Sequence, residues 1–224
     1  MSRWLASSVR TVSQHWLATS GQSIPDPWVH EYFSIHSKIP EEAKSPKVAL
    51  KQALDAVFQQ DQLWVLSEVP FCIGTADNNK NQTKRLDFVL CPKTMQSPLP
   101  VVAIELKTTM EFNPLAAALM EFALLTDTDT SIFLPFSTAN ARYLKSSNCK
   151  IKCLTVSYFD NQDASPLLTI MQNRLWQGGQ RKVHHYCLFF PSPQSSKEAI
   201  QIQYRYAEDI IRALAKEVRE WFES

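Results

Sequence analysis

Residues 85–109, RLDFVLCPKTMQSPLPVVAIELKTT, constrain the fold more than any other part of this chain. Two apolar runs rich in β-branched residues, LDFVLC and VVAIELK, lie on either side of a proline-flanked connection. This pattern predicts two antiparallel strands joined by the segment 92–100. Both runs also carry charged residues, which are costly inside a sheet, so the stretch needs a chemical explanation as well as a structural one.

The short connection determines which residues of the two strands lie opposite one another. In the expected register Val89 faces Ala103, so Asp87 faces Glu105, with Cβ atoms about 5 Å apart. Because side chains alternate along a strand, Lys107 shares the face of Glu105. We therefore expect these three charged side chains to converge.

Two carboxylates that face each other destabilise a strand pair unless a cation compensates their charge. Mg²⁺ prefers carboxylate oxygens and retains several waters, so acids at the edge of a sheet can hold it against a substrate phosphate. A lysine beside them can orient the attacking water and neutralise charge that develops on the phosphorus oxygens. The spacing of Asp87, Glu105 and Lys107 therefore predicts hydrolysis of a phosphodiester with Mg²⁺ or Mn²⁺.

The order LDFVL, loop, VVAIELK resembles the Asp…Glu-X-Lys signature of the PD-(D/E)XK nuclease superfamily, over roughly residues 47–160. The resemblance implies a metal-dependent endonuclease or exonuclease with a restriction-endonuclease-like core. It also implies that Asp87 and Glu105 are metal ligands, that Lys107 is the catalytic lysine, and that the carbonyl of Leu106 is a further ligand. Leu86 stands where the superfamily's name-giving proline would be. Among its members the chain looks most like stand-alone or transposon-end nucleases, with roles in defence, mobile elements or repair.

Members of this superfamily often add an acid from the first helix or the first strand. The candidates here are Glu68, within SEVPF, and Asp55, in the first helix. We favour Glu68, because its apolar neighbours predict a strand that pairs beside the strand of the first acid. Lys84 and Arg85 are candidate contacts for DNA phosphates, although solvated loop cations are the commoner case. Glu121 lies in the helix after the motif, and we assign it no role.

The rest of the chain predicts an α/β fold in which helices cover a mixed sheet, as in restriction-endonuclease-like proteins. Helical patterns cover 47–60, 114–125 and 138–147, and strand-like runs cover 63–71, 85–91, 101–107, 131–136 and 151–159. The polar segment 74–84 reads as a long hairpin loop. The region 165–193 contains a short helix, a turn at Gly178–Gly179 and the strand-like run HHYCLFF.

Two terminal segments flank this core. We expect residues 1–40 to form an N-terminal helix and a proline-rich linker, and residues 41–224 to form one domain that includes a C-terminal helix. The first 25 residues are free of acids, as in a transit peptide, but their helical apolar spacing favours an ordinary packed helix. The apolar seam of the last helix (Tyr204, Ala207, Ile211, Leu214, Val218, and Trp221 or Phe222) favours packing on its own domain over a homodimer or a partner protein.

Composition narrows the function less than the hairpin does. Lys and Arg number 23 against 22 Asp and Glu, so the net charge gives no sign of a nucleic-acid partner. It does not exclude such a partner either. No apolar run approaches the roughly 18 to 20 residues that span a bilayer. Five cysteines, odd in number and mostly in apolar runs, suit buried thiols in the cytoplasm.

Two further groups of residues are candidate sites. Cys149, Cys153, His184 and Cys187 could form a zinc site, but their placement in apolar strands favours buried thiols. His184 and His185 are adjacent on a strand and point to opposite faces, so at most one reaches any given site.

A metal-dependent nuclease acting on DNA is the function that the sequence favours. The alternative is a catalytically inactive module of the same fold that serves as a protein- or nucleic-acid-binding scaffold. The sequence carries no helix-turn-helix or zinc-finger signature, so it leaves open whether the substrate is DNA or RNA and whether a base sequence is read.

Overall fold

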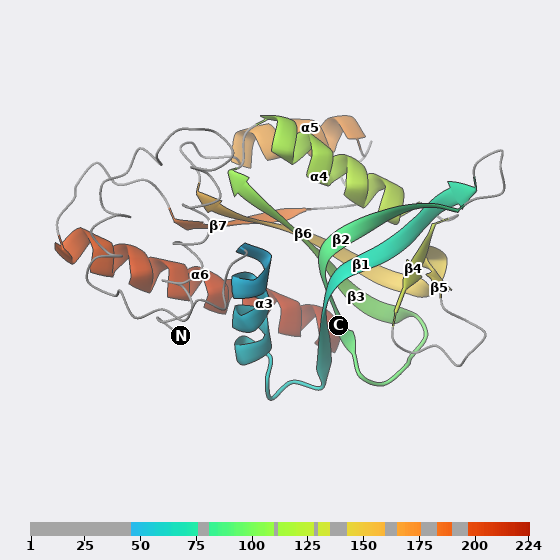
Figure 1. The fold of residues 1–224 in the computed structure, drawn as a ribbon, viewed down its shortest axis with the longest axis horizontal. Coiled ribbons are helices and arrows are strands. Elements are labelled where there is room, and N and C mark those ends of the chain that lie inside the picture. The colour runs from blue at the N-terminus through green and yellow to red at the C-terminus, as the bar shows by residue number, and fades with distance from the viewer. Residues whose placement is uncertain are drawn as a thin grey trace.

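A seven-stranded mixed sheet with helices on both faces forms the core of the computed structural model (Figure 1). The structure describes residues 46–75, 81–109, 112–127, 130–134, 143–159, 165–175, 183–189 and 197–224. The elements are α3 (Pro46–Val57), β1 (Leu63–Thr75), β2 (Asn81–Pro92), β3 (Leu99–Thr109), α4 (Phe112–Leu125), β4 (Ser131–Phe133), β5 (Tyr143–Lys145), β6 (Cys149–Phe159), α5 (Ser165–Leu175), β7 (His184–Phe189) and α6 (Lys197–Glu223). The expected α/β class is therefore confirmed. The predicted N-terminal helix and linker (1–40) and the Gly178–Gly179 turn lie outside the described residues.

The strand order in the sheet is β5-β4-β1-β2-β3-β6-β7. Neighbours pair antiparallel from β5 to β3, and β3, β6 and β7 run parallel. The pairing of β2 with β3 has the expected register, since Val89 lies opposite Ala103. The hairpin that the sequence predicts therefore sits at the centre of the sheet.

The two faces of the sheet bury alternate residues of the same strands. On one face Phe88 of β2 and Ile104 of β3 pack against α3 and α6. On the other face Val89 and Ala103 pack against α4, with α5 beside it (Figure 1). Burial on both sides explains why these strands read as nearly continuous apolar runs. A charged residue within them must therefore lie in the core or at its margin.

Helix α6 packs its apolar seam on its own domain, as expected for Ile211, Leu214 and Val218, which are fully buried. The side chains of Tyr204 and Ala207 lie outside the described set. The seam from Ile211 onward is therefore occupied by the sheet.

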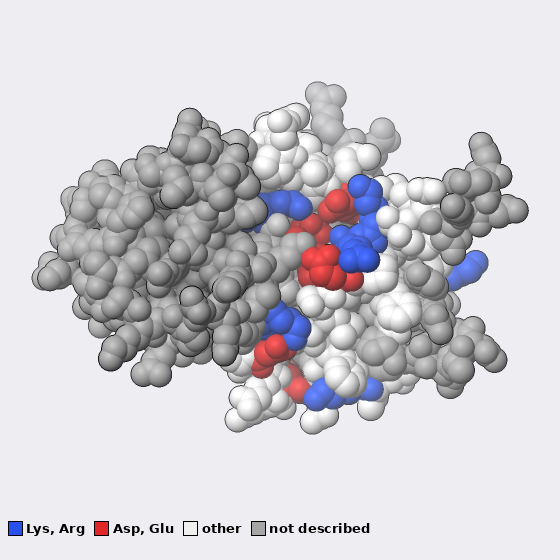
Figure 2. Space-filling model, viewed as in Figure 1, with Lys and Arg blue, Asp and Glu red and all other residues white. Residues whose placement is uncertain are grey.

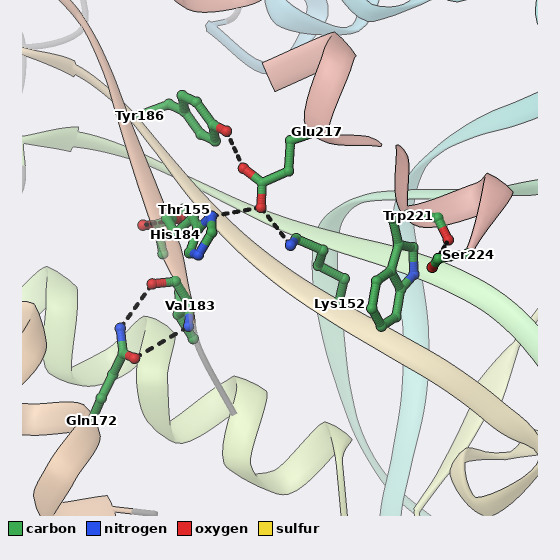
Figure 3. Close-up of polar contacts among 9 residues, drawn as sticks. All are labelled: Lys152, Thr155, Gln172, Val183, His184, Tyr186, Glu217, Trp221 and Ser224. Atoms are coloured by element: carbon green, nitrogen blue, oxygen red, sulfur yellow. Dashed lines mark hydrogen bonds and ion pairs between the residues drawn. The ribbon is translucent and has the colours of Figure 1, made fainter. Parts of the chain in front are cut away.

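A buried carboxylate fixes α6 to strands β6 and β7 (Figure 3). Glu217 lies 2.5 Å from the Nζ of Lys152 and 2.6 Å from the Nδ1 of His184. The hydroxyl of Tyr186 donates a hydrogen bond to its second oxygen. Burial alone would raise the pKa of Glu217, but these three donors outweigh it and hold that pKa below its ordinary value. Glu217 is thus a compensated carboxylate.

A second anchor holds the C-terminal end of α6. Arg219 donates to Asp61 and to the carbonyl oxygen of Val57, both at 3.0 Å, which ties α6 to the end of α3. The ammonium group of Lys150 lies 4.6 Å from the ring centroid of Trp221, a cation–π contact. The C-terminal part of α6 is therefore attached to the domain by polar contacts as well as by its apolar seam.

The expected loop 74–84 is shorter than predicted. Strand β1 continues to Thr75 and β2 begins at Asn81, so the polar residues Gln82, Thr83 and Lys84 lie on a strand rather than in a loop. Their backbone groups pair with β1, from Phe71 onward, while their side chains are exposed. Composition suggested a turn, but the ladder of the hairpin holds the polar segment extended.

The predicted helix over 138–147 is wrong where the structure describes it. Residues 143–145 form β5, which pairs with β4, and a 3₁₀ turn follows at Ser146–Asn148. The exposed edge of β4 offers unpaired backbone groups, and pairing with them overrides the local helical preference.

Within the described part of the chain, no helix is both long and apolar enough to cross a membrane.

Candidate metal centre

Strands β2 and β3 separate where the charged residues lie. Their backbone pairing ends at Phe88 and Ile104, and Asp87 and Glu105 form the next pair along the two strands. Beyond that point, hydrogen bonds between backbone N–H groups and carboxylate side chains replace the backbone pairing of the two strands. The N–H of Leu106 donates to Asp87 Oδ2 at 2.8 Å, and the N–H of Asp87 donates to Glu105 Oε1 at 3.2 Å. The two carboxylates are therefore held between the strands, close to each other.

Lys107 completes the group. Its Nζ donates to Glu105 Oε2 at 2.8 Å. Asp87 is 7% exposed and Glu105 is 2% exposed, while the side chain of Lys107 retains 20% exposure. The structure thus brings together the three charged residues that the register places side by side.

Lys107 compensates the charge of Glu105 only in part. Burial, followed by the charge of Asp87, raises the pKa of Glu105 to about 8, and Lys107 offsets only part of the rise. Glu121 of α4 adds a further increment, so this helix also contributes negative charge near the centre. Near neutral pH, Glu105 therefore either keeps a proton or needs a second positive charge.

Lys107 remains an ammonium group. Its burial would lower its pKa, but Glu105 above all, with Asp87 and Glu121, raises that pKa above the ordinary value. A lysine with a raised pKa donates hydrogen bonds and positive charge, and it is not suited to abstract a proton.

The oxygen atoms at this position suit a hard divalent cation. Two buried carboxylates lie close together, and hard cations prefer such oxygens. A third oxygen is near, because the N–H and C=O of a strand residue point toward the same neighbouring strand. The N–H of Leu106 points to Asp87, so its carbonyl lies on the same side, beyond the last β2–β3 backbone pair. The residues present therefore fit a Mg²⁺ or Mn²⁺ ion.

The structure places Glu68 beside the centre but not within its buried part. In the β1–β2 ladder it falls opposite Asp87, between the pairs Ser67–Phe88 and Val69–Leu86. It has a φ of 53°, in the left-handed region, and its side chain is exposed. This kink coincides with a change of face, because Leu86 packs toward α4 whereas Phe88 packs toward α3 and α6. The expected pairing of its strand with β2 is confirmed.

The alternative acid, Asp55, lies away from the carboxylate pair. It is on α3, which covers the opposite face of the sheet, and it pairs with Lys51 at 2.6 Å on the surface. Lys84 and Arg85 are exposed on β2, shortly before Asp87. These two basic side chains therefore precede Asp87 on the same strand, β2.

The candidate zinc ligands are divided between the two faces of the sheet. His184 contacts Glu217 on the α6 side, whereas Cys153 belongs to the core under α4. No group of three His, Cys, Asp or Glu side chains in the described ranges is arranged to hold a metal. The carboxylate pair, with a backbone carbonyl, is therefore the candidate centre that the described chain offers.

Sequence reasoning missed two polar residues on the face of Glu105, and it did not connect them with His185. Thr155 and Ser157 of β6 are fully buried and lie opposite Glu105 and Lys107 in the parallel register. His185 of β7 contacts both hydroxyls, at 3.0 Å and 3.3 Å. The available signal was the alternation Thr-Val-Ser inside an apolar strand, which puts two hydroxyls on one buried face.

Charge on the molecular surface is mixed. Basic and acidic side chains lie next to one another near the middle of the face shown in Figure 2, rather than in separate patches. This agrees with the near balance of charges in the sequence. A polyanionic substrate would therefore meet local cations rather than a broad positive surface.

Comparisons of the chain with protein-family models, with curated proteins and with solved structures find no match.

Proposed function

We propose that this protein is a metal-dependent nuclease with a restriction-endonuclease-like core, which hydrolyses phosphodiester bonds in DNA. One observation carries the proposal. Asp87 and Glu105 are buried face to face between separating strands, and Lys107 offsets only part of the rise in the pKa of Glu105. A structural role would favour a fully compensated Glu105, whereas a bound cation would supply the positive charge that Glu105 lacks.

The roles of the residues follow from their atoms. Asp87 and Glu105 hold Mg²⁺ or Mn²⁺ through their carboxylates, with the carbonyl of Leu106 as a further oxygen. The bound ion supplies Lewis-acid polarisation of the phosphoryl group and lowers the pKa of a coordinated water. Lys107, which stays protonated, donates to the phosphate oxygens or to the attacking water.

Cations of β2 supply the contacts to the substrate backbone. Lys84 and Arg85 are exposed on the hairpin that leads into Asp87, so a strand bound at the centre passes near them. Contacts to phosphates position a nucleic acid without reading its sequence. These two residues therefore act on affinity rather than on sequence preference.

The test is cleavage of supercoiled and linear DNA by the full-length chain with Mg²⁺, with Mn²⁺ and with EDTA. We expect metal-dependent cleavage by the wild type, which Asp87→Asn and Lys107→Ala abolish while they remain folded by circular dichroism. Lys216→Ala is the matched control, because this lysine is 78% exposed on α6. DNA binding without cleavage under every metal condition would refute the proposal in favour of an inactive scaffold.

A further inference from the structure

The polar side chains Thr155, Ser157 and His185 continue the charged group across the sheet. In the parallel register Thr155 lies opposite both Glu105 and His185, and Ser157 lies opposite Lys107. Paired residues of neighbouring strands lie on the same face, about 4.8 Å apart across the hydrogen-bonding direction. The polar row therefore runs without a break over β3, β6 and β7, on the face that α4 covers.

The contacts of His185 determine how the two hydroxyls point. Thr155 Oγ1 donates its hydrogen to the carbonyl oxygen of His184 at 3.4 Å, so Oγ1 itself accepts a hydrogen from Nδ1 of His185, 3.0 Å away. A ring with its hydrogen on Nδ1 has an acceptor at Nε2. Ser157 Oγ lies 3.3 Å from Nε2, and its hydrogen therefore points toward the ring. The lone pairs of the Ser157 oxygen are then left to face other donors.

The Ser157 oxygen would offer the Lys107 ammonium group a second hydrogen-bond acceptor. This ammonium group is bound to Glu105 Oε2, an oxygen of the carboxylate that we assign to the metal. A divalent cation and an ammonium group at the same carboxylate repel each other, so metal binding favours a shift of the Lys107 ammonium group away from Glu105. The lysine stem is flexible, and the buried hydroxyl of Ser157 lies on the adjacent strand beside it.

We propose that Ser157, oriented by His185, is a second acceptor for the Lys107 ammonium group, which moves there from Glu105 when the divalent metal binds. This inference rests on the proposed metal-dependent function. Ser157 and His185 are positioning residues, because they act through Lys107 and not on the substrate. Thr155 fixes the ring of His185 and thereby the direction of the Ser157 hydroxyl.

The neighbouring histidine provides a matched control. His184 precedes His185 on β7, but its ring points to the opposite face and contacts Glu217 (Figure 3). A change at His184 therefore perturbs the same strand to a similar extent without touching the polar row.

The experiment measures the affinity for Mn²⁺ alone, by calorimetry on the full-length chain, for the wild type and for Ser157→Ala, His185→Gln and His184→Gln. We expect Ser157→Ala to weaken Mn²⁺ binding about tenfold, since a hydrogen bond to an ammonium group is lost. His185→Gln should retain most of the affinity, because its amide can also accept from Ser157. His184→Gln should bind Mn²⁺ like the wild type.

A second background excludes a merely structural effect. In Lys107→Ala the ammonium group is gone, so adding Ser157→Ala should change the Mn²⁺ affinity less than twofold. In cleavage assays Ser157→Ala should lower kcat at saturating metal and leave the KM for DNA unchanged.

The outcomes separate this inference from the proposed function. Equal Mn²⁺ affinity in the wild type and Ser157→Ala overturns the inference alone, provided that the wild type binds Mn²⁺ and cleaves DNA. An equal loss in the Lys107→Ala background also overturns it, because the effect would then not pass through the lysine. A wild type that neither binds Mn²⁺ nor cleaves DNA refutes both.

Discussion

Two glutamates on opposite faces of the sheet, Glu105 and Glu217, have similar surroundings and opposite electrostatic states. Both are largely buried, and both pair with a lysine. Yet burial and Asp87 raise the pKa of Glu105 to about 8, whereas donors hold the pKa of Glu217 below its ordinary value. The number of hydrogen-bond donors and the presence of a second acid make the difference.

The comparison shows how a structural carboxylate differs from a candidate functional one. Glu217 contacts the ammonium group of Lys152, the ring of His184 and the hydroxyl of Tyr186, and these donors compensate its charge within the fold (Figure 3). Lys107 offsets only part of the rise in the pKa of Glu105 that burial and the charge of Asp87 cause. A buried carboxylate that is not fully compensated costs stability, and a bound cation would recover it.

Cleavage should show the largest difference between the two glutamates. We expect Glu105→Gln to reduce metal-dependent cleavage by about 10³-fold, because metal charge stabilisation is lost. Glu217→Gln should cleave within about threefold of the wild type, since α6 lies on the other face of the sheet. Rates from gel-resolved time courses at equal folded protein test this. Comparable losses in the two variants would mean that the faces are not functionally distinct.

Stability should rank the glutamates in the reverse order. Glu217→Ala leaves Lys152, His184 and Tyr186 without their shared acceptor and should destabilise the domain by about 2–3 kcal/mol. Glu220→Ala is the control on the same helix, because this exposed residue pairs only weakly with Lys216 at 3.7 Å; it should cost less than about 0.5 kcal/mol. Urea unfolding measures both. A cost for Glu217→Ala as small as that of the control would show that its cluster is not a stabilising anchor.

The pH dependence of stability should have opposite signs at the two sites. Because the pKa of Glu105 rises from 4.5 to about 8, its proton stabilises the folded state fully below pH 4.5, and this contribution is lost as pH rises toward 8. In EDTA at pH 8.5, Glu105→Gln should therefore be more stable than the wild type, by on the order of 2 kcal/mol. Glu217, with a lowered pKa, contributes stability above its ordinary pKa and loses it as pH falls. Thermal melts from pH 4 to 9 would contradict this account if Glu105→Gln were the less stable protein at pH 8.5.

The smallest change in stability and in cleavage is expected at Asp55, the alternative acid on α3. Asp55 pairs on the surface with Lys51, so Asp55→Asn should change stability by less than about 0.5 kcal/mol and leave cleavage unchanged. Glu68→Gln, beside Asp87, is the informative comparison, because a role in the centre requires it to reduce cleavage. A loss of cleavage in Asp55→Asn alone would reverse our preference between the two acids.

The centre of the fold and the meeting of its charges could be predicted because they follow from local periodicity. A hairpin register places Asp87 opposite Glu105 once Val89 faces Ala103, and no long-range information is needed. The buried seam of α6 is likewise visible in the spacing of Ile211 and Leu214.

What sequence reasoning could not supply depends on partners distant in the chain. Residues 143–145 form a strand because β4 offers an edge, which no local pattern shows. Thr155 and His185 meet because β6 and β7 run parallel in a particular register, although 30 residues separate them. The compensation of Glu217 similarly needs α6 to lie on β6 and β7.

The central claim is that the buried carboxylate pair of Asp87 and Glu105 binds a divalent cation. A titration of the metal-free protein with Mn²⁺ at pH 8, followed by electron paramagnetic resonance, tests it directly. We predict that the wild type and Glu217→Gln bind Mn²⁺ with the same affinity, and that Glu105→Gln and Asp87→Asn bind it at least tenfold more weakly. Unchanged binding in Glu105→Gln and Asp87→Asn, or no binding by the wild type, would contradict the account.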